Sequence, residues 1–241
     1  MHVTVIAKSP VPGRVKTRLC PPCTLQQAAD LAEAGIIDTI EAIDRALPSQ
    51  STVRKFLLLD GELQPWMPSD WDVVAQRGSG LGERLRNGFT DLGPGAIVGM
   101  ETPHVAGLLP AALDLIRDGH DLLGPAEDGG YWMIGLCAET IVRVADVFDA
   151  VPMSTADTGA AQLERLHSVG RSTRLLPTAR DLDNYDDLRA IATAGRDGRL
   201  AVLASRIVSS LDVDQPAASA LNLPELPITL DNGGPCISRH S

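Results

Sequence analysis

The sequence predicts an α/β domain built on a largely parallel β-sheet with helices on both faces. Short apolar runs typical of strands alternate along the chain with longer amphipathic segments typical of helices. Polar and glycine-rich loops follow the apolar runs, as expected where ligands bind at the carboxyl ends of parallel strands. With 241 residues, 44% of them hydrophobic, the chain has ample apolar side chains for a core. Together these observations indicate successive βα units.

The N-terminal part supplies three strands and a long helix. Residues 2–7 form an apolar run that predicts a buried strand. The segment from Thr24 to Gln27 has the form of a capping box, which predicts a helix that ends near Leu47. Strands at 53–59 and 71–75 follow, each ending at a turn or a glycine-rich loop.

The remainder of the chain continues the alternation. The same patterns predict helices from Leu81, near Leu109, and at 140–150, 157–169 and 185–194, and strands at 96–100, around 122–123, at 131–136 and at 172–176. From Ser205 onward, after a last helical stretch, the sequence is rich in Pro, Ser, Asn and Gly, which is typical of a loosely ordered tail or an arm packed on a neighbour. We therefore expect a domain at 1–204 and a C-terminal tail or arm at 205–241.

Composition excludes several classes of function. A formal net charge of −10 at pH 7 argues against broad binding to nucleic acid or to an anionic membrane. No apolar run reaches membrane-spanning length, so we expect a soluble, cytoplasmic protein. Four cysteines are too few for a disulfide scaffold in a chain of this length, and Cys20 and Cys23 are read either as a redox or zinc half-site or as the ends of a stiff Pro-Pro turn.

A basic loop follows the first strand. It contains Lys8, Arg14, Lys16 and Arg18, together with two prolines and Gly13. Cations at the carboxyl end of a strand are well placed to bind phosphate, and the prolines restrict the shape of the loop. The spacing of a Walker P-loop is absent. A solvated basic turn is the alternative.

A second loop, rich in glycine, precedes the helix that begins at Leu81. Gly78, Gly80 and Gly82 would let backbone amides approach a base or a phosphate, and the helix would present its positive N-terminal end to that ligand. Such turns are also common as purely structural features, so this loop does not by itself indicate a ligand.

Acidic residues follow two of the later strands. Glu101 comes directly after the strand at 96–100, and Glu127 and Asp128 come after the strand around 122–123. Carboxylates that converge from neighbouring strand ends can hold Mg²⁺ or Mn²⁺, which would bridge phosphate oxygens. An ordinary acidic turn is the alternative, although the glycines and aromatic residues after Asp128 suggest close approach of a ligand.

Other polar residues carry weaker signals. His104 could donate to a phosphate but is more simply a surface residue. Ser154 and Thr155 precede a helix that they could cap, with contact to an acceptor substrate as the alternative. The acidic run that includes Asp181 and Asp183 is explained by helix capping, and within it we select Asp183 as a neighbour of a metal ion.

The chain resembles a known family through four segments in order, which are residues 7–19, 80–84, 99–103 and 123–132. They look like the corresponding segments of a bacterial glycosyltransferase-like family within the GT-A nucleotide-diphospho-sugar transferase superfamily. More distantly, the Lys16-Thr17-Arg18-Leu19 segment is similar to that of the 2-phospholactate guanylyltransferases and the molybdenum-cofactor nucleotidyltransferases. The resemblance implies a Rossmann-like three-layer α/β/α sandwich with a mostly parallel mixed sheet.

The resemblance also implies an active site, with Asp128 and Lys16 as catalytic residues and with Glu101 and Asp128 holding Mg²⁺ or Mn²⁺. The nucleotide-binding residues would be Ala7, Lys8, Ser9, Gly13, Arg14, Lys16, Arg18, Gly80, Gly82 and Arg84, and the acceptor would contact Gly129, Gly130, Tyr131, Ser154 and Thr155. Related sequences usually have Asp where this chain has Glu101.

The reaction expected from the resemblance is glycosyl transfer from a nucleotide-diphospho-sugar to a small-molecule acceptor. Nucleotidyl transfer from an NTP with release of pyrophosphate is an alternative, because four cations in one loop could clamp a triphosphate. A catalytically silent nucleotide-binding protein is a third reading, suggested by Glu101 and the tail. No nucleic-acid partner and no membrane span are expected, and a homo-oligomer is left open.

Overall fold

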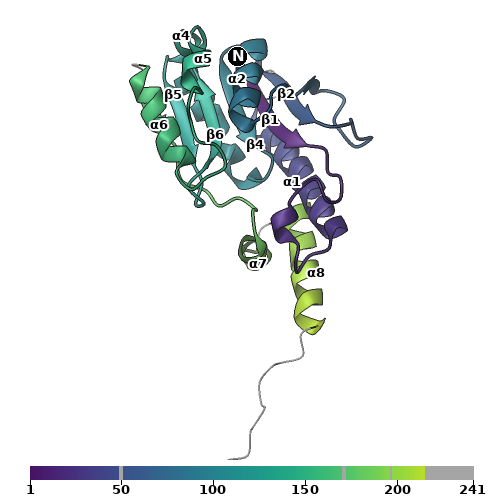
Figure 1. Cartoon of the computed structure of the whole chain (residues 1–241). Coiled ribbons are helices and arrows are strands. Elements are labelled where there is room, and N and C mark those ends of the chain that lie inside the picture. The colour runs from purple at the N-terminus through teal and green to yellow at the C-terminus, as the bar shows by residue number, and fades with distance from the viewer. Residues whose placement is uncertain (49–50, 170–171, 196, 215–241) are drawn as a thin grey trace, which may run out of the picture.

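The fold is built on one mixed β-sheet. The computed structural model describes residues 1–48, 51–169, 172–195 and 197–214. Within these ranges the sheet has seven strands in the order β3-β2-β1-β4-β6-β5-β7 (Figure 1). The strands are β1 (His2–Lys8), β2 (Arg54–Asp60), β3 (Asp72–Ala75), β4 (Gly95–Gly99), β5 (Asp121–Pro125), β6 (Tyr131–Leu136) and β7 (Thr173–Leu175). Strand β6 runs antiparallel to β4 and β5, and the other pairings are parallel. The predicted mostly parallel mixed sheet is confirmed.

Helices cover both faces of this sheet and complete the predicted three layers. They are α1 (Leu25–Ala46), α2 (Leu81–Leu92), α3 (Leu109–Arg117), α4 (Ala138–Ile141), α5 (Val144–Val147), α6 (Thr158–Ser168), α7 (Tyr185–Thr193) and α8 (Arg199–Asp214), with 3₁₀ turns η1 (Thr17–Leu19) and η2 (Pro103–Leu108). Helices α1 and α3 pack in one hydrophobic cluster with the sheet, while α2, α5 and α6 pack in another. None of the helices in the described ranges has the length and apolar character needed to cross a bilayer.

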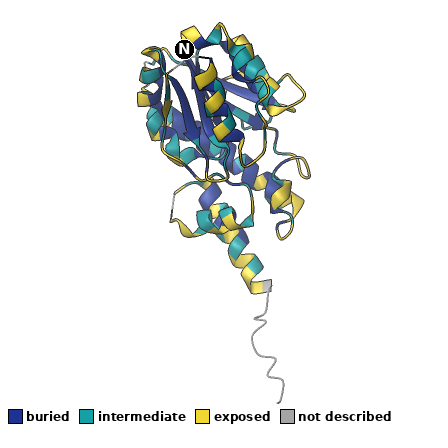
Figure 2. Cartoon of the chain, turned by 60° about the vertical axis from the view of Figure 1, so that its left-hand side comes forward, coloured by how far each residue is buried: buried dark blue, intermediate teal, exposed yellow. Residues whose placement is uncertain are grey.

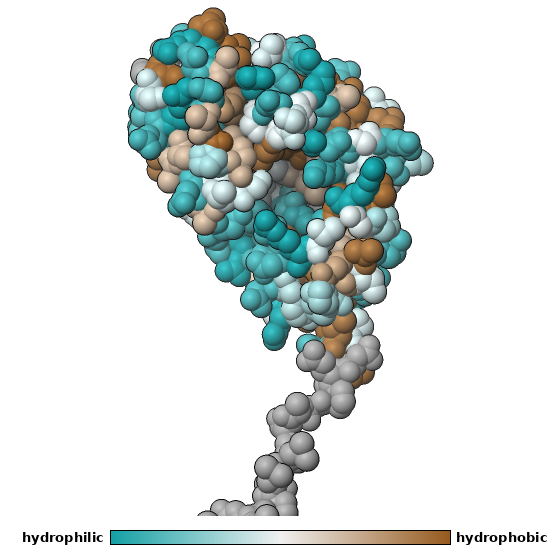
Figure 3. Space-filling model, in the orientation of Figure 1, coloured by the Kyte–Doolittle hydropathy of each residue, from teal (hydrophilic) through white to brown (hydrophobic). Residues whose placement is uncertain are grey.

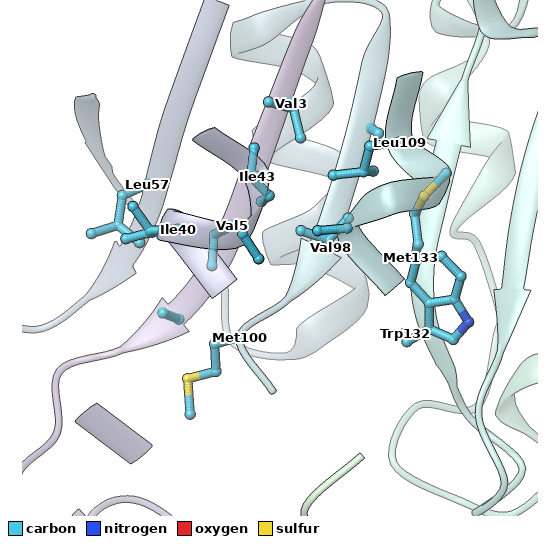
Figure 4. Close-up of a cluster of buried hydrophobic side chains, with 14 of the residues drawn as sticks. Val3, Val5, Ile40, Ile43, Leu57, Val98, Met100, Leu109, Trp132 and Met133 are labelled. Carbon is cyan, nitrogen blue, oxygen red and sulfur yellow. The ribbon is translucent and has the colours of Figure 1, made fainter. Parts of the chain in front are cut away.

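Helix α1 begins where the sequence predicts and covers the middle of the sheet. The Thr24 hydroxyl accepts the Gln27 N–H at 3.1 Å, and the Gln27 side chain accepts the Thr24 N–H at 2.8 Å, which completes the capping box. Ile40 and Ile43 of the helix lie against Val3 and Val5 of β1 (Figure 4). Burying each such side chain contributes roughly 1.5–3 kcal/mol. The five inner strands, β2, β1, β4, β6 and β5, are accordingly mostly buried (Figure 2), whereas the edge strands β3 and β7 are largely exposed.

The single helix predicted at 140–150 is wrong. The chain forms two short helices there, α4 and α5, separated by Val142 and Arg143, and the backbone of Arg143 is not helical. Thr140, Ile141 and Val142 are all β-branched and lose side-chain freedom in a helix, so this run has weak helix propensity. The Thr140 hydroxyl also donates to the buried Asp121 carboxylate at 2.7 Å, which fixes the first short helix independently of the second.

Helix α8 continues past residue 205, where the sequence suggested that a tail begins, and runs to Asp214. Its N-terminal end is held by a buried carboxylate from the middle of α1. Asp38 accepts the backbone N–H groups of Arg199 at 3.1 Å and Leu200 at 2.9 Å. This contact satisfies two donors at the helix start and attaches α8 to α1. Residues 215–241 of the predicted tail lie outside the described residues.

Candidate functional site

A cavity of about 850 Å³ opens where β1, β4 and β5 end and β6 begins. Because β6 is antiparallel to its neighbours, its first residues lie at the same edge of the sheet as their carboxyl ends. Figure 3 shows this face of the molecule as mainly hydrophilic and hollowed near its centre. The predicted site residues that line the cavity are Ala7, Lys8, Arg14, Lys16, Arg18, Gly80, Arg84, Glu101, Asp128, Gly130, Tyr131, Ser154 and Thr155. Segments from across the sequence therefore meet in one place.

The four cations of the basic loop fall into two pairs. Lys8 and Arg14 are exposed at the cavity and have no carboxylate within ion-pair distance in the described ranges. Arg18 donates to Asp183 at 2.6 Å, and the Lys16 ammonium is bonded to the Glu101 carboxylate. All four cations line the cavity, and two of them, Lys16 and Arg18, are neutralised there by carboxylates of the protein.

Lys16 is held more tightly than its neighbours in the loop. Its side chain is 8% exposed, and its ammonium also donates to the Leu182 carbonyl. Its backbone is left-handed, with φ 50°, which is uncommon for a residue with a side chain. The contact ties the loop after β1 to the end of β4 and to the segment before α7.

Four predicted site residues do not line the cavity. Ser9 is buried, and its hydroxyl donates to the Glu62 carbonyl. Gly13 adopts φ 79° and shapes the turn in which the Arg14 N–H bonds to the Val11 carbonyl at 3.0 Å. Gly82 faces the Met153 side chain, and Gly129 packs against the backbone of Ala156. These four residues form turns and packing contacts in the segments around the cavity and are not part of its lining.

Two other sequence signals lie away from the cavity. His104 is an exposed residue of η2 and is not part of the lining. Cys20 and Cys23 are thiols, and burial raises the pKa of Cys23. A raised pKa makes a thiol less reactive as a thiolate, which favours the structural reading of the Pro-Pro turn.

Gln76 is a cavity residue that sequence reasoning missed. Its side-chain amide donates to the Ala7 carbonyl at 2.7 Å and to the Leu58 carbonyl at 2.9 Å, bridging the ends of β1 and β2. Its carbonyl accepts from Arg84 at 3.1 Å, and Arg84 donates also to Asp60 at 2.6 Å. The first turn of α2, opened by Gly80 without a side-chain cap, lies beside this network.

The acidic wall of the cavity consists of Glu101, Asp128 and Asp181. It depends on a backbone pairing between two segments that are far apart in the sequence. Ala126 forms a parallel bridge with Ala179, and the Glu127 N–H donates to the Ala179 carbonyl at 3.1 Å. This pairing brings Asp181 to the cavity beside Asp128 and Glu101. Glu127 itself turns away and pairs with Arg180 at 2.7 Å.

The pKa of Asp181 is raised by its surroundings. Burial, followed by the nearby carboxylates of Glu101 and Asp128, raises its pKa to about 6. Asp183 is instead paired with Arg18. Farther along the acidic run, Asp187 closes a capping box with Asn184 at the start of α7, so helix capping explains that part of the run.

Replacing Asp181 with asparagine is expected to stabilise the fold in a pH-dependent manner. The folded pKa lies above the unfolded value of 3.8, so ionisation of Asp181 opposes folding as the pH rises from about 4 to about 6 and does so fully above that range. The rise in pKa corresponds to about 3 kcal/mol, and because Asp181 is partly exposed to water, Asp181→Asn should increase the free energy of unfolding by about 2 kcal/mol at pH 8 and by little at pH 4. Denaturant titrations at the two pH values measure this difference. Asp183→Asn is the control, since it removes a carboxylate already paired with Arg18 and should not stabilise; a pH-independent effect of Asp181→Asn would contradict the assignment.

The donor chemistry of the acidic wall suits a hard divalent cation, but its arrangement does not yet form a complete site. Glu101, Asp128 and Asp181 supply the carboxylate oxygens that Mg²⁺ and Mn²⁺ prefer. Among the residues that the structure describes, no three His, Cys, Asp or Glu side chains form a group that could hold a metal ion. The Glu101 carboxylate would first have to part from Lys16.

Beside the loop that carries Asp128, the cavity is lined by hydroxyl and aromatic groups. Tyr131 begins β6, and its hydroxyl donates to Gln162 at 3.4 Å. Thr155 accepts the Asp157 N–H at 3.3 Å just before α6, but the N-cap of that helix is Asp157 and it has no side-chain capping bond, so the predicted capping by Ser154 and Thr155 is wrong. Ser154 is exposed and has a left-handed backbone with φ 62°.

Comparisons with known proteins agree with this fold. A family model described as "Uncharacterized protein conserved in bacteria (DUF2064)" matches residues 39–155. The sequence matched none of the curated proteins. A solved structure described as "putative nucleotide-diphospho-sugar transferase" from Desulfovibrio desulfuricans G20 is 23% identical, covers 89% of this chain and 98% of its own, and superposes with a TM-score of 0.75. At this identity the likeness demonstrates the fold, and the chain therefore has the fold of that protein.

Two further structures are more remote. Rv0371c from Mycobacterium tuberculosis H37Rv is 20% identical over 79% of this chain and 98% of that one, with a TM-score of 0.48. The manganese complex of Rv0371c is 18% identical over 79% of this chain and 97% of that one, with a TM-score of 0.44. Likeness at this level supports no conclusion about the present site.

Proposed function

We propose that this chain is a transferase that binds a nucleotide-diphospho-sugar in the cavity and transfers its sugar to a small acceptor. The observation that carries the proposal is the position of Lys8 and Arg14, which line the cavity without carboxylate partners in the described ranges. Cations left unpaired in a protein of net charge −10 favour an anionic ligand. The shared fold with the D. desulfuricans protein and the resemblance of the basic loop support the same function.

The pairing of the loop cations favours a diphosphate over a triphosphate. Of the four cations that could have clamped a triphosphate, Lys16 and Arg18 are bonded to Glu101 and Asp183. Before a ligand binds, the loop cations left unpaired in the described ranges are Lys8 and Arg14, and these two match the charge of a nucleoside diphosphate better than that of an NTP. Glycosyl transfer, which expels a nucleoside diphosphate, is therefore our first assignment, and nucleotidyl transfer is the second.

The donor would lie with its nucleoside toward α2. Gly80 opens that helix with no side-chain cap, so its first N–H groups can meet acceptor atoms of the ligand. Arg84, fixed by Asp60 and Gln76, contributes a further donor at this end. The phosphates would then bridge from α2 to Lys8 and Arg14, leaving the sugar near Asp128.

Asp128 is our candidate for the catalytic carboxylate. Its Oδ1 accepts the Gly130 N–H at 2.8 Å, which fixes the side chain and leaves Oδ2 to accept a proton from an acceptor hydroxyl. Tyr131, Ser154 and Thr155 would contact that acceptor, and Gly130 would shape its approach. A divalent cation, when held by Glu101 and Asp128, would neutralise charge on the leaving diphosphate.

The function is tested by product analysis. The full chain would be incubated with UDP-, GDP- and dTDP-sugars, or with NTPs, in the presence of Mg²⁺ or Mn²⁺ and a panel of small hydroxyl and phosphate acceptors. Release of a nucleoside diphosphate from a sugar donor supports glycosyl transfer, and Asp128→Asn should reduce that rate at least tenfold. Thr193→Ala, on α7 outside the cavity lining, is the control variant.

The other readings give different results in the same experiment. Pyrophosphate release from an NTP would replace the first assignment by nucleotidyl transfer. Nucleotide binding with no turnover of either kind would identify a catalytically silent binding protein. Absence of any nucleotide binding would reject the proposal.

A further inference from the structure

Lys16 occupies the position from which it can control access to Glu101. The residue opens η1 with a left-handed backbone, and its ammonium lies between the Leu182 carbonyl and the Glu101 carboxylate. Left-handed backbone is unfavourable for a residue other than glycine, and it persists where the surrounding contacts hold it. Here those contacts are two bonds to residues more than eighty positions away in the sequence, Glu101 in the cavity lining and Leu182 between the lining residues Asp181 and Asp183.

The ammonium and a divalent cation would exclude each other at Glu101. The two side chains are mostly shielded from water, at 8% exposure for Lys16 and 19% for Glu101, so repulsion between an ammonium and a metal ion sharing one carboxylate is weakly screened. Glu101 and Asp128 are the carboxylates proposed to hold the metal ion, and the Glu101 carboxylate is already bonded to the Lys16 ammonium. The Lys16–Glu101 contact therefore keeps a hard-oxygen ligand from a metal.

A phosphate could release the pair. Lys16 lines the same cavity as Lys8 and Arg14, which are available to bring a phosphate to the loop. An ammonium bonds well to phosphate oxygens, so Lys16 could exchange the carboxylate for the ligand without remaining unpaired.

We propose that Lys16 is a latch that blocks divalent metal at Glu101 until a phosphate-bearing ligand takes its ammonium. Metal binding would then follow nucleotide binding. The order of binding rests on the proposed function, whereas the competition at Glu101 does not and can be tested without any nucleotide.

The test is a titration of the full, nucleotide-free chain with Mn²⁺, followed by electron paramagnetic resonance of the free ion. Lys16→Met should bind one Mn²⁺ at least tenfold more tightly than the wild type. Arg14→Met is the matched control, because it removes a cavity cation that does not contact Glu101, and it should change Mn²⁺ affinity less than threefold. Adding Glu101→Gln to Lys16→Met should return the affinity to the wild-type level.

The latch is overturned if Lys16→Met and Arg14→Met raise Mn²⁺ affinity equally, since the effect would then be one of general charge. It is also overturned if the wild type binds Mn²⁺ as tightly as Lys16→Met and loses it in Glu101→Gln. Lys16→Gln is a second variant of similar size should Lys16→Met fold poorly, as judged by circular dichroism. If the competition is found but UDP and GDP do not bind, the proposed function fails while the role of Lys16 at Glu101 stands.

Discussion

Replacing Lys8 and Arg14 together with methionine is expected to lower affinity for nucleoside diphosphates by at least 100-fold. Both side chains face the cavity, and neither forms an ion pair in the described part of the chain. A hydrogen bond from a charged group contributes roughly 1.5–3 kcal/mol, so two of them together account for about 3–6 kcal/mol. Isothermal titration calorimetry with UDP and GDP at a fixed ionic strength measures the loss.

The single variants and a distant control make this result interpretable. Each single substitution should lower affinity by roughly 10-fold or more, and the dependence on salt should become weaker as charges are removed. Arg117→Met, on α3 and paired with Asp114, removes one positive charge outside the cavity and should leave affinity unchanged. If the double variant binds as the wild type does, the basic loop is not the phosphate site.

Gly129→Ala is expected to lower the free energy of unfolding by about 4 kcal/mol, combining the cost of a left-handed backbone with that of overpacking. Gly129 has φ 88°, and a Cβ at this position would overlap the carbonyl group of Ala156. The Gly129 carbonyl also accepts the Gly159 N–H at 2.8 Å, so neither segment can move away without losing that bond. Denaturation in urea, followed by circular dichroism, measures the change.

Gly107→Ala provides the comparison. A Cβ at Gly107 would meet nothing within 4 Å, and the residue does not require a positive φ, so this variant should stay within about 1 kcal/mol of the wild type. An equally small effect of Gly129→Ala would mean that the acidic loop rearranges easily and that its close packing on Ala156 is not needed for stability.

Most of the fold could be predicted because it depends on local patterns. Period and length of the apolar runs identify the strands, and the capping box at Thr24 identifies the start of α1, because side chains and backbone a few residues apart determine each of them. The β-branched run at 140–142 is a local signal for the split between α4 and α5. The apolar pattern of the same segment nevertheless led to the prediction of a single helix. Antiparallel β6 cannot be identified locally, since strand direction depends on the path of the whole chain.

Position at a strand end was the physical signal behind part of the candidate site. Lys8, Glu101 and Asp128 were found because a parallel sheet brings the carboxyl ends of its strands together. Asp181 was missed because the bridge between Ala126 and Ala179, which brings it to the cavity, leaves no local signal. Gln76 was missed for a similar reason, as its partners are backbone carbonyls of two other strands.

The sequence also did not reveal which cations of the basic loop are paired with carboxylates. The sequence contains four cations in that loop, and nothing in their spacing distinguishes Lys8 and Arg14 from Lys16 and Arg18. The distinction arises because Glu101 and Asp183 approach from distant segments. Charge counted from sequence therefore overestimates the charge that the protein offers to a ligand.

The attachment of α8 through Asp38 has a consequence for how this protein can vary. Leu19, which follows Lys16 and Arg18, is buried in the same hydrophobic cluster as Leu200 and Ala204 of α8, with Leu182 between the two ends of the chain. The basic loop is thus seated on a surface that includes the C-terminal helices. Insertions or deletions in the C-terminal helices would therefore shift the position of the basic loop at the cavity. We expect the sequences of these two regions to change together during evolution.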